Sequence, residues 1–159
     1  MASPTPAQVK ARAVAWAHWM VFHKAQIAYE MERPFPLTSR LPLRNDCSAT
    51  FTLCYFLAGA PDPNGPAFHY DGYGNTTSLA EHGQQVTLGQ LQPGDAVLYY
   101  SEAGFSPYDT EHVAIVVYDE KTPDPMTMSH GWSGEPALVR VSEDGRPHRF
   151  FRYATNYRF

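Results

Sequence analysis

Cysteine, charge and long apolar runs are all scarce in this sequence. Its 159 residues include only two cysteines, Cys47 and Cys54, no CxxC pair and seven dispersed histidines, a pattern that does not favour a structural zinc site. If both cysteines belong to one helix, their spacing places the Cα atoms about 10 Å apart, beyond the reach of a disulfide. We therefore expect two free thiols, no metal ion and no other cofactor.

Positive charge is scarce as well. The formal net charge is -4 and charged residues make up 18% of the chain, so the broad basic surface that nucleic-acid binding needs is missing. The longest apolar run, Ala13–Phe22, is interrupted by His18 and is far shorter than the about 20 residues that cross a bilayer. Residues 1–6 lack the basic start and apolar stretch of a signal peptide. We expect no nucleic-acid partner, no membrane insertion and no obligate protein partner.

Apolar and aromatic residues are well represented. They make up 43% and 14% of the chain, respectively, which is enough to bury a hydrophobic core. At this length we predict a single domain over residues 1–159, with residues 1–5 flexible. The 14 prolines are scattered without a repeat, which predicts shaped loops between short elements.

Two helices are predicted in the first half of the chain. Thr5–Gln8 fits a capping box, and an amphipathic stripe free of glycine and proline follows from Ala7 to about Met31. A second helix is predicted from Cys47 to about Leu57, capped by Asn45 or Asp46.

Strands dominate the second half. After a mostly irregular stretch over residues 60–90, four β-rich runs are found: Ala96–Tyr100, His112–Tyr118, Met126–His130 and Arg149–Tyr153. The almost continuously apolar sequence of the second run is typical of a strand buried on both faces. Helices first and strands afterwards predict an α+β domain.

Cys47 is the first candidate for chemistry. It follows Asn45 and Asp46 at the predicted start of a helix, where free backbone N–H groups and the helix dipole favour an anion. We therefore predict a lowered pKa for the Cys47 thiol, although a buried, inert cysteine is the competing interpretation. Cys54 lies among apolar residues in the middle of the same helix, and we expect it to be inert.

A reactive cysteine needs a base, and His112 opens the most apolar strand of the chain. If Asp119–Pro123 form a hairpin loop, strand pairing symmetric about residue 121 places His112 opposite His130, close enough for two imidazoles to interact. A thiol at a helix start, a histidine on a strand and a polar residue on the next strand fit the nucleophile, base and orienting roles of covalent catalysis.

At this point the sequence resembles a known family. The segments Asn45–Ser48, Leu91–Asp95 and Glu111–Val116 look like three ordered blocks of the NlpC-type, papain-like cysteine peptidases. The stretches 58–65 and Ser129–Gly131 further resemble peptidase modules of lysins from phages that infect actinobacteria. The resemblance implies a papain-like fold of the NlpC/CHAP type, with N-terminal helices packed on a central antiparallel β-sheet.

The resemblance also implies residue roles in a peptidoglycan endopeptidase. Cys47 would be the nucleophile, His112 the general base and His130 the third, orienting residue. The chain departs from the usual pattern at Ala49, where glycine is common, and in the long, proline-rich loop before His130. The second departure leaves Glu135 as a competing orienting residue.

Further residues complete the predicted site. Asp46 and Ser48 flank the nucleophile and are expected beside it, where backbone N–H groups at the helix start would hold the oxyanion. Tyr99, Tyr108 and Trp132 are candidates for lining a groove for a stem peptide, with ordinary half-buried aromatics as the competing interpretation.

These features favour a cell-wall hydrolase that cuts an amide in the peptide stem or cross-link of peptidoglycan. A phage endolysin module would be made in the host cytoplasm and reach the wall after release, and a module carried on a virion would have a similar sequence. Two alternatives keep the same Cys/His pair: a secreted antibacterial amidase toxin and a papain-like acyltransferase. A non-catalytic wall-binding module is a third.

Overall fold

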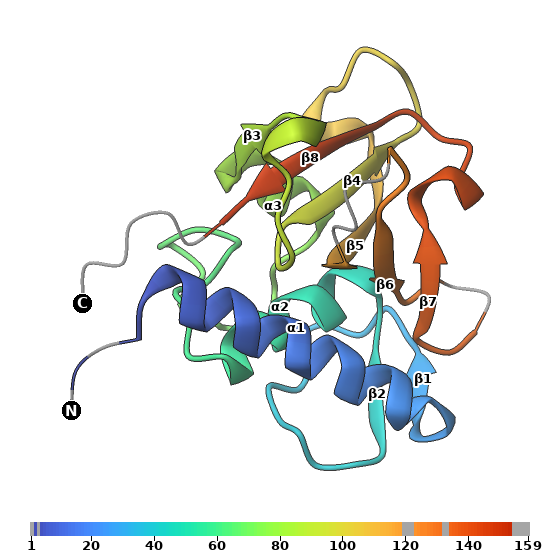
Figure 1. Cartoon of the computed structure of the whole chain (residues 1–159). Coiled ribbons are helices and arrows are strands. Elements are labelled where there is room, and N and C mark those ends of the chain that lie inside the picture. The colour runs from blue at the N-terminus through green and yellow to red at the C-terminus, as the bar shows by residue number, and fades with distance from the viewer. Residues whose placement is uncertain (1, 3, 119–122, 132–133, 154–159) are drawn as a thin grey trace.

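A computed structural model shows an α+β domain in which helices pack on a six-stranded antiparallel sheet (Figure 1). The structure describes residues 2, 4–118, 123–131 and 134–153. Within this part of the chain, no helix is long and apolar enough to cross a membrane. The predicted α+β architecture is confirmed.

The first helix, α1, spans Pro6–Phe22. The predicted capping box is present, because the Thr5 side chain accepts from the backbone of Gln8 and the Gln8 side chain accepts from the backbone of Thr5. The prediction that this helix continues to about Met31 is wrong. A short 3₁₀ helix over Lys24–Gln26 follows, and then the chain extends into β1.

Strand β1 (Ile27–Tyr29) pairs in parallel with β2 (Leu43–Asn45). This small sheet lies near the C-terminal end of α1 (Figure 1). Its partner strand comes from beyond the proline-rich segment, so the pairing that ends the helix is not encoded in the local amphipathic pattern. The tertiary contact therefore overrides the helical periodicity.

Helix α2 spans Cys47–Leu57, as predicted. Of the two proposed caps, Asp46 is the one used: its carboxylate accepts a hydrogen bond from the backbone N–H of Ala49 at 2.9 Å. Residues 47–55 are all buried, so the helix lies within the core and its first residue is held firmly beneath the sheet.

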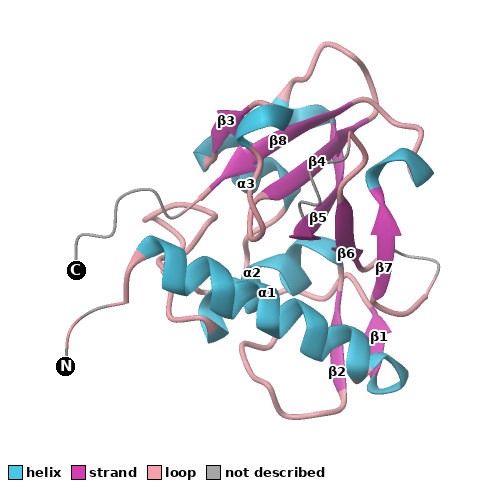
Figure 2. Ribbon diagram, in the orientation of Figure 1, coloured by secondary structure: helices cyan, strands magenta, loops and turns pink. Residues whose placement is uncertain are grey.

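The large sheet has the order β3-β8-β4-β5-β6-β7, and every neighbouring pair is antiparallel (Figure 2). Its strands are β3 (Gln84–Val86), β4 (Ala96–Tyr100), β5 (Thr110–Tyr118), β6 (Met126–Ser129), β7 (Ala137–Arg140) and β8 (His148–Arg152). The sequence did not predict β3, β7 or helix α3 (Thr76–His82). The 60–90 stretch thus holds more regular structure than expected. The remaining 3₁₀ helices cover Leu88–Gln90, Pro107–Asp109 and Val141–Glu143.

Strand β5 is buried on both faces, as predicted. Val113, Ile115 and Val117 belong to the core shared with α1 and α2. Ala114 and Val116 belong to a second, smaller core on the opposite face. Because side chains alternate along a strand, the residue before Val113 points to the face away from α1 and α2.

The predicted register of the β5–β6 hairpin is wrong by one residue. Ala114 pairs with Ser129 and Ile115 with Met128, and the register shifts between Val116 and Tyr118. The loop over 119–122 lies outside the described residues. A slip of one residue moves a side chain to the other face of a sheet, so this irregularity decides which β6 side chain shares a face with His112.

The turn before β4 is anchored by a buried carboxylate. Asp95 is fully buried and receives two hydrogen bonds from Arg152 on β8, at 3.0 and 2.8 Å. The backbone N–H of Gln92 donates to the same carboxylate at 2.8 Å. A buried charge is tolerated only when it is paired in this way, so the turn fixes β4 against β8 and does not contribute to the site described below.

Candidate active site

Cys47 is the first residue of α2, and its side chain lies under the start of β5. Cys47 is 6% exposed, and its thiol interacts with the backbone N–H groups of Val113 and Ser48. The hydroxyl of Tyr29 on β1 also hydrogen-bonds to this sulfur. Three elements distant in the sequence therefore converge on one sulfur atom, next to the residue that follows His112.

The prediction of a lowered Cys47 pKa is wrong. Burial, and secondarily the negative charge of Asp46, raise the pKa of the thiol to about 11. The two backbone N–H groups and the charge of Arg33 oppose this change without reversing it. The free cysteine is thus a neutral thiol near neutral pH, and it must lose its proton to a base as it reacts. Cys54 is a buried, free thiol, as expected.

Asp46 and Ser48 lie beside the nucleophile, within a cluster organised by Arg33. The Asp46 carboxylate is 3.0 Å from the Arg33 guanidinium, which also donates to the Ser48 hydroxyl at 3.0 Å. Ser48 in turn donates to Asp46 at 3.1 Å, and Arg33 donates to the backbone carbonyl of Gly74 at 3.0 Å. These side chains are engaged with one another and fix the first turn of α2. Arg33 was not predicted to take part.

His112 lies at the start of β5 and is almost fully buried. Its Nε2 atom is 2.7 Å from the hydroxyl oxygen of Ser129, and its ring stacks on Tyr99 with 5.6 Å between centroids. Tyr99 is only 2% exposed. Tyr99 therefore packs against one face of the imidazole inside the protein. Because it is buried, the prediction that it lines a substrate groove is wrong.

Burial lowers the pKa of His112 to about 4, with further lowering from the positive charge of Arg146 and from His130. Asp144 acts in the opposite direction. Arg146 bridges Asp144 at 2.6 Å and Glu111 at 3.2 Å. His112 is thus a neutral imidazole near neutral pH, which is the form that accepts a proton.

His130 is brought to the site region but not into the predicted pair with His112. It follows β6 and is buried, with Nδ1 3.0 Å from the Thr50 hydroxyl and Nε2 3.1 Å from the Gly134 carbonyl oxygen. Thr50 belongs to α2, so this ring faces the helices. The register described above explains why: His112 hydrogen-bonds to Ser129, the neighbouring residue.

Tyr29 is the functional candidate that the sequence analysis missed. Its ring packs edge-on against His130, with 5.3 Å between centroids, and its hydroxyl reaches Cys47. Burial is the largest cause that raises its pKa to about 12, so the phenol remains a hydrogen-bond donor. The residue was hidden because the amphipathic pattern assigned it to the first helix.

The other predicted residues lie elsewhere. The Glu135 carboxylate is about half exposed and forms an ion pair with Lys24 at 3.9 Å, an arrangement different from that of an orienting residue bonded to an imidazole. Tyr108 is 81% exposed on the 3₁₀ helix before β5. Trp132 lies outside the described residues.

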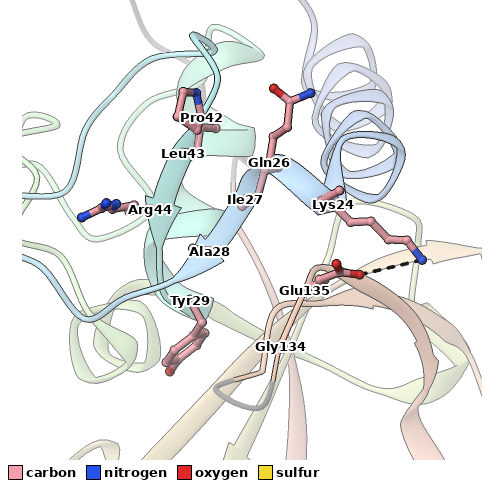
Figure 3. Close-up of a pocket in the computed structure, with 11 residues that line it drawn as sticks. Lys24, Gln26, Ile27, Ala28, Tyr29, Pro42, Leu43, Arg44, Gly134 and Glu135 are labelled. Atoms are coloured by element: carbon pink, nitrogen blue, oxygen red, sulfur yellow. Dashed lines mark ion pairs between the residues drawn. The ribbon is translucent and has the colours of Figure 1, made fainter.

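A hollow of about 600 Å³ opens beside Tyr29 (Figure 3). One wall is formed by β1, β2 and the residues just before them, and the other by Gly134 and Glu135. Its charged side chains are Lys24, Arg44 and Glu135, and Lys24 and Glu135 form an ion pair (Figure 3). Within the described part of the chain, no group of histidine, cysteine and acidic side chains is arranged to hold a metal ion.

Solved structures with the same fold carry NlpC/P60 domains. RipD from Mycobacterium tuberculosis, a non-catalytic NlpC/p60 domain protein adapted to peptidoglycan binding, matches with a TM-score of 0.59 and 18% identity over 91% of this chain and 97% of RipD. The peptidoglycan hydrolase RipB from the same organism matches with a TM-score of 0.55 and 15% identity, over 96% of this chain and 72% of RipB.

NlpC1 from Trichomonas vaginalis also matches, with a TM-score of 0.55 and 15% identity over 89% of this chain. The chain spans about half the length of this protein and of NlpC2, covering 44% and 49% of them. No protein-family model and no curated protein matches the sequence. At these identities the similarity establishes architecture, and the chain has the papain-like α+β fold of NlpC/P60 domains.

Proposed function

We propose that this chain is a cysteine peptidase that hydrolyses an amide bond in the peptide part of peptidoglycan. The observation that carries the proposal is the position of the Cys47 sulfur at the start of α2, against the backbone N–H of Val113, the residue after His112. Cys47 and His112, which are distant in the sequence, thus flank the same residue of β5. The imidazole lies on the face of β5 that holds Tyr99, and the proposed reaction requires its Nδ1 atom to reach the sulfur past the start of the strand. RipB, which has the same fold, is a peptidoglycan hydrolase.

The reaction would start from a neutral pair, because the pKa of Cys47 is raised and that of His112 is lowered. The Nε2 atom of His112 is engaged with Ser129, so Nδ1 would be the nitrogen that accepts the thiol proton while the sulfur attacks the scissile carbonyl carbon. Backbone N–H groups in the first turn of α2 stabilise the oxyanion. His112 then protonates the leaving amine, and water, deprotonated by His112, releases the acyl group from the sulfur.

The hollow beside Tyr29 is our proposed place for part of the stem peptide. It adjoins the residue that contacts the Cys47 sulfur. Its lining has two positive side chains, Lys24 and Arg44, and one negative side chain, Glu135, and this excess of positive charge favours the free carboxylates of a stem peptide. This location replaces the groove of Tyr99 and Trp132 that the sequence suggested.

The biological setting is also a proposal. The sequence resemblance to peptidase modules of phage lysins supports an endolysin module that is made in the host cytoplasm and acts on the wall after release, or one carried on a virion. An antibacterial amidase toxin and an acyltransferase of the same group would use the same Cys47 and His112 chemistry.

A second candidate function is peptidoglycan binding without catalysis. It is favoured by the raised pKa and low exposure of Cys47, and by RipD, a non-catalytic protein with the same fold. In this case Cys47 would serve only to pack the start of α2 against β5.

The two functions are separated by incubating the protein with purified actinobacterial peptidoglycan and identifying new amine ends by mass spectrometry. We expect new ends with the unmodified chain and with Cys54→Ala, which removes the other buried thiol, and none with Cys47→Ala. Co-sedimentation with peptidoglycan without new ends would contradict the hydrolase and support the binding function.

A further inference from the structure

We propose that Ser129, and not His130, is the positioning residue that orients His112. This inference rests on the proposed function, since it assigns a role within the same site. Its basis is the 2.7 Å contact between the Ser129 hydroxyl oxygen and His112 Nε2, together with the pairing of Ser129 with Ala114. Ser129 and His112 thus occupy diagonal positions on the same face of neighbouring strands.

A hydroxyl can donate or accept, so the contact suits either tautomer of His112, and the proposed role assigns the proton to Nε2. With Nε2–H donating to the Ser129 hydroxyl oxygen, the lone pair of Nδ1 is free to accept a proton. When Nδ1 becomes protonated during the reaction, Nε2 keeps its own proton, so the hydrogen bond persists in both states of the ring. A hydroxyl is sufficient for this purpose because the bond requires an acceptor and no charge.

The stack with Tyr99 completes the restraint. The centroids are 5.6 Å apart and the ring planes are inclined by 29°, so Tyr99 supports one face of the imidazole. Ser129 holds the ring edge at Nε2. Together the two contacts fix the plane of the ring and its rotation within that plane, which is the geometric task of an orienting residue.

His130 is occupied by a separate chain of hydrogen bonds. The Gly134 carbonyl can only accept, so Nε2 of His130 must carry a proton and donate to it. A neutral ring then accepts at Nδ1 from the Thr50 hydroxyl. Thr50 in turn contacts the Asn45 side-chain amide at 2.8 Å.

The Asn45 amide supports this direction of bonding. Its Nδ2 atom is buried and, among the described residues, has no hydrogen-bond partner when Oδ1 faces Thr50. Turning the amide lets Nδ2 donate to the Thr50 hydroxyl oxygen, and amide orientation is assigned from such networks. The hydrogen bonds then all point the same way: Asn45 Nδ2 donates to the Thr50 hydroxyl, which donates to His130 Nδ1, and His130 Nε2 donates to the Gly134 carbonyl. Both nitrogens of the neutral His130 ring are thus used, and neither is left for His112.

The test compares Ser129→Ala with Ser129→Thr, which keeps a hydroxyl, and with Thr127→Val as a matched control. Thr127 lies on the same strand and bonds to the Val139 carbonyl, so its replacement also removes a β6 hydroxyl without touching His112. Two readouts are taken: the tautomer of His112 by ¹⁵N NMR of the free protein, and kcat on soluble muropeptides.

We expect the Nε2–H tautomer of His112 in the unmodified chain, in Ser129→Thr and in Thr127→Val, and a mixture of tautomers in Ser129→Ala. The kcat of Ser129→Ala should fall about tenfold, with KM unchanged and Ser129→Thr restoring most of the rate. An unchanged tautomer in Ser129→Ala would overturn the proposal.

The NMR readout does not require turnover. If the unmodified chain cuts no muropeptide, the proposed function fails while the tautomer comparison still decides whether Ser129 orients His112. If the chain is active and a His130→Gln substitution shifts the His112 tautomer while Ser129→Ala does not, the orienting role belongs to His130 and the inference is wrong.

Discussion

The hydroxyl of Tyr29 donates a hydrogen bond to the sulfur of Cys47, although one residue comes from β1 and the other from the start of α2. Burial raises the pKa of Tyr29 to about 12, and the nearby charges of Cys47 and Asp46 act in the same direction. The phenol therefore stays protonated at working pH and can donate to negative charge that develops on the sulfur or on the adjacent oxyanion.

We predict that Tyr29→Phe lowers kcat by about 10- to 100-fold, because a hydrogen bond to a charged group contributes about 1.5–3 kcal/mol. The phenylalanine ring keeps the edge-on contact with His130, so the melting temperature should change little. Steady-state kinetics on soluble muropeptides measure the effect. Tyr108→Phe, at an exposed position, is the control, and equal kcat values for the two variants would argue against a role for the Tyr29 hydroxyl.

The parts of the site that were predictable from the sequence depend on local chemistry. The start of α2 at Cys47 follows from an acidic cap that bonds within one turn of its own helix. The apolar run of β5 is likewise visible in the sequence, because a strand buried on both faces needs no alternation. The helix cap and the apolar run both depend on residues that are close in the sequence.

The parts that were missed depend on distant partners. Because of the register shift between Val116 and Tyr118, Ser129 lies beside His112 in the place where His130 was predicted. No local sequence pattern predicts an irregularity of this kind. The role of Tyr29 was missed because β1 pairs with β2, which follows a long proline-rich segment. The raised pKa of Cys47 is set by burial, which is known only once the fold is assembled.

Thiol reactivity should follow the raised pKa of Cys47. We predict that the rate of alkylation by iodoacetamide rises with pH without levelling off below pH 9, since burial and Asp46 disfavour the thiolate. Asp46→Asn removes the negative charge while keeping a side chain that can cap the helix, and should speed alkylation at pH 8 severalfold. A Cys47→Ser variant measures the background from Cys54. A midpoint at or below about 8.5 in the unmodified chain would contradict the raised pKa.

Folding stability should depend on pH through His112 and His130. Burial lowers the pKa of each from 6.5 to about 4 in the folded chain. The unfolded chain therefore binds protons below pH 6.5 that the folded chain binds only below about 4. Stability is fully present above pH 6.5 and falls as the pH drops through this window, by about 2 kcal/mol per ring between pH 7 and 4.5.

Urea unfolding at pH 7 and 4.5 tests this dependence. His130→Gln removes one of the two rings, so its loss of stability between the two pH values should be about 2 kcal/mol smaller than that of the unmodified chain. Carboxylates titrate in both proteins and cancel in the comparison. Identical losses would show that His130 does not carry a lowered pKa.

Arg33 should contribute to stability through Asp46. The carboxylate is buried and the guanidinium is partly exposed, with 3.0 Å between them, so Arg33→Ala leaves a buried charge without its main partner. We expect a loss of about 2 kcal/mol, reduced from the value for a fully buried pair by solvent screening. Arg33→Lys keeps the charge without the fork that also reaches Ser48 and should cost less. A double-mutant cycle with Asp46→Asn measures the coupling, and additive effects would contradict a direct interaction.

Substrate binding in the hollow beside Tyr29 should depend on Arg44, which lines it and lies 3.5 Å from Glu30 in an exposed ion pair. Because exposed charges contribute at most about 1 kcal/mol, we predict that Arg44→Ala raises KM for a stem peptide up to about fivefold with little change in kcat. Arg12→Ala, on the exposed face of α1, removes the same charge away from the hollow. If both substitutions change KM equally, the effect reflects overall charge, and the peptide does not bind in the hollow.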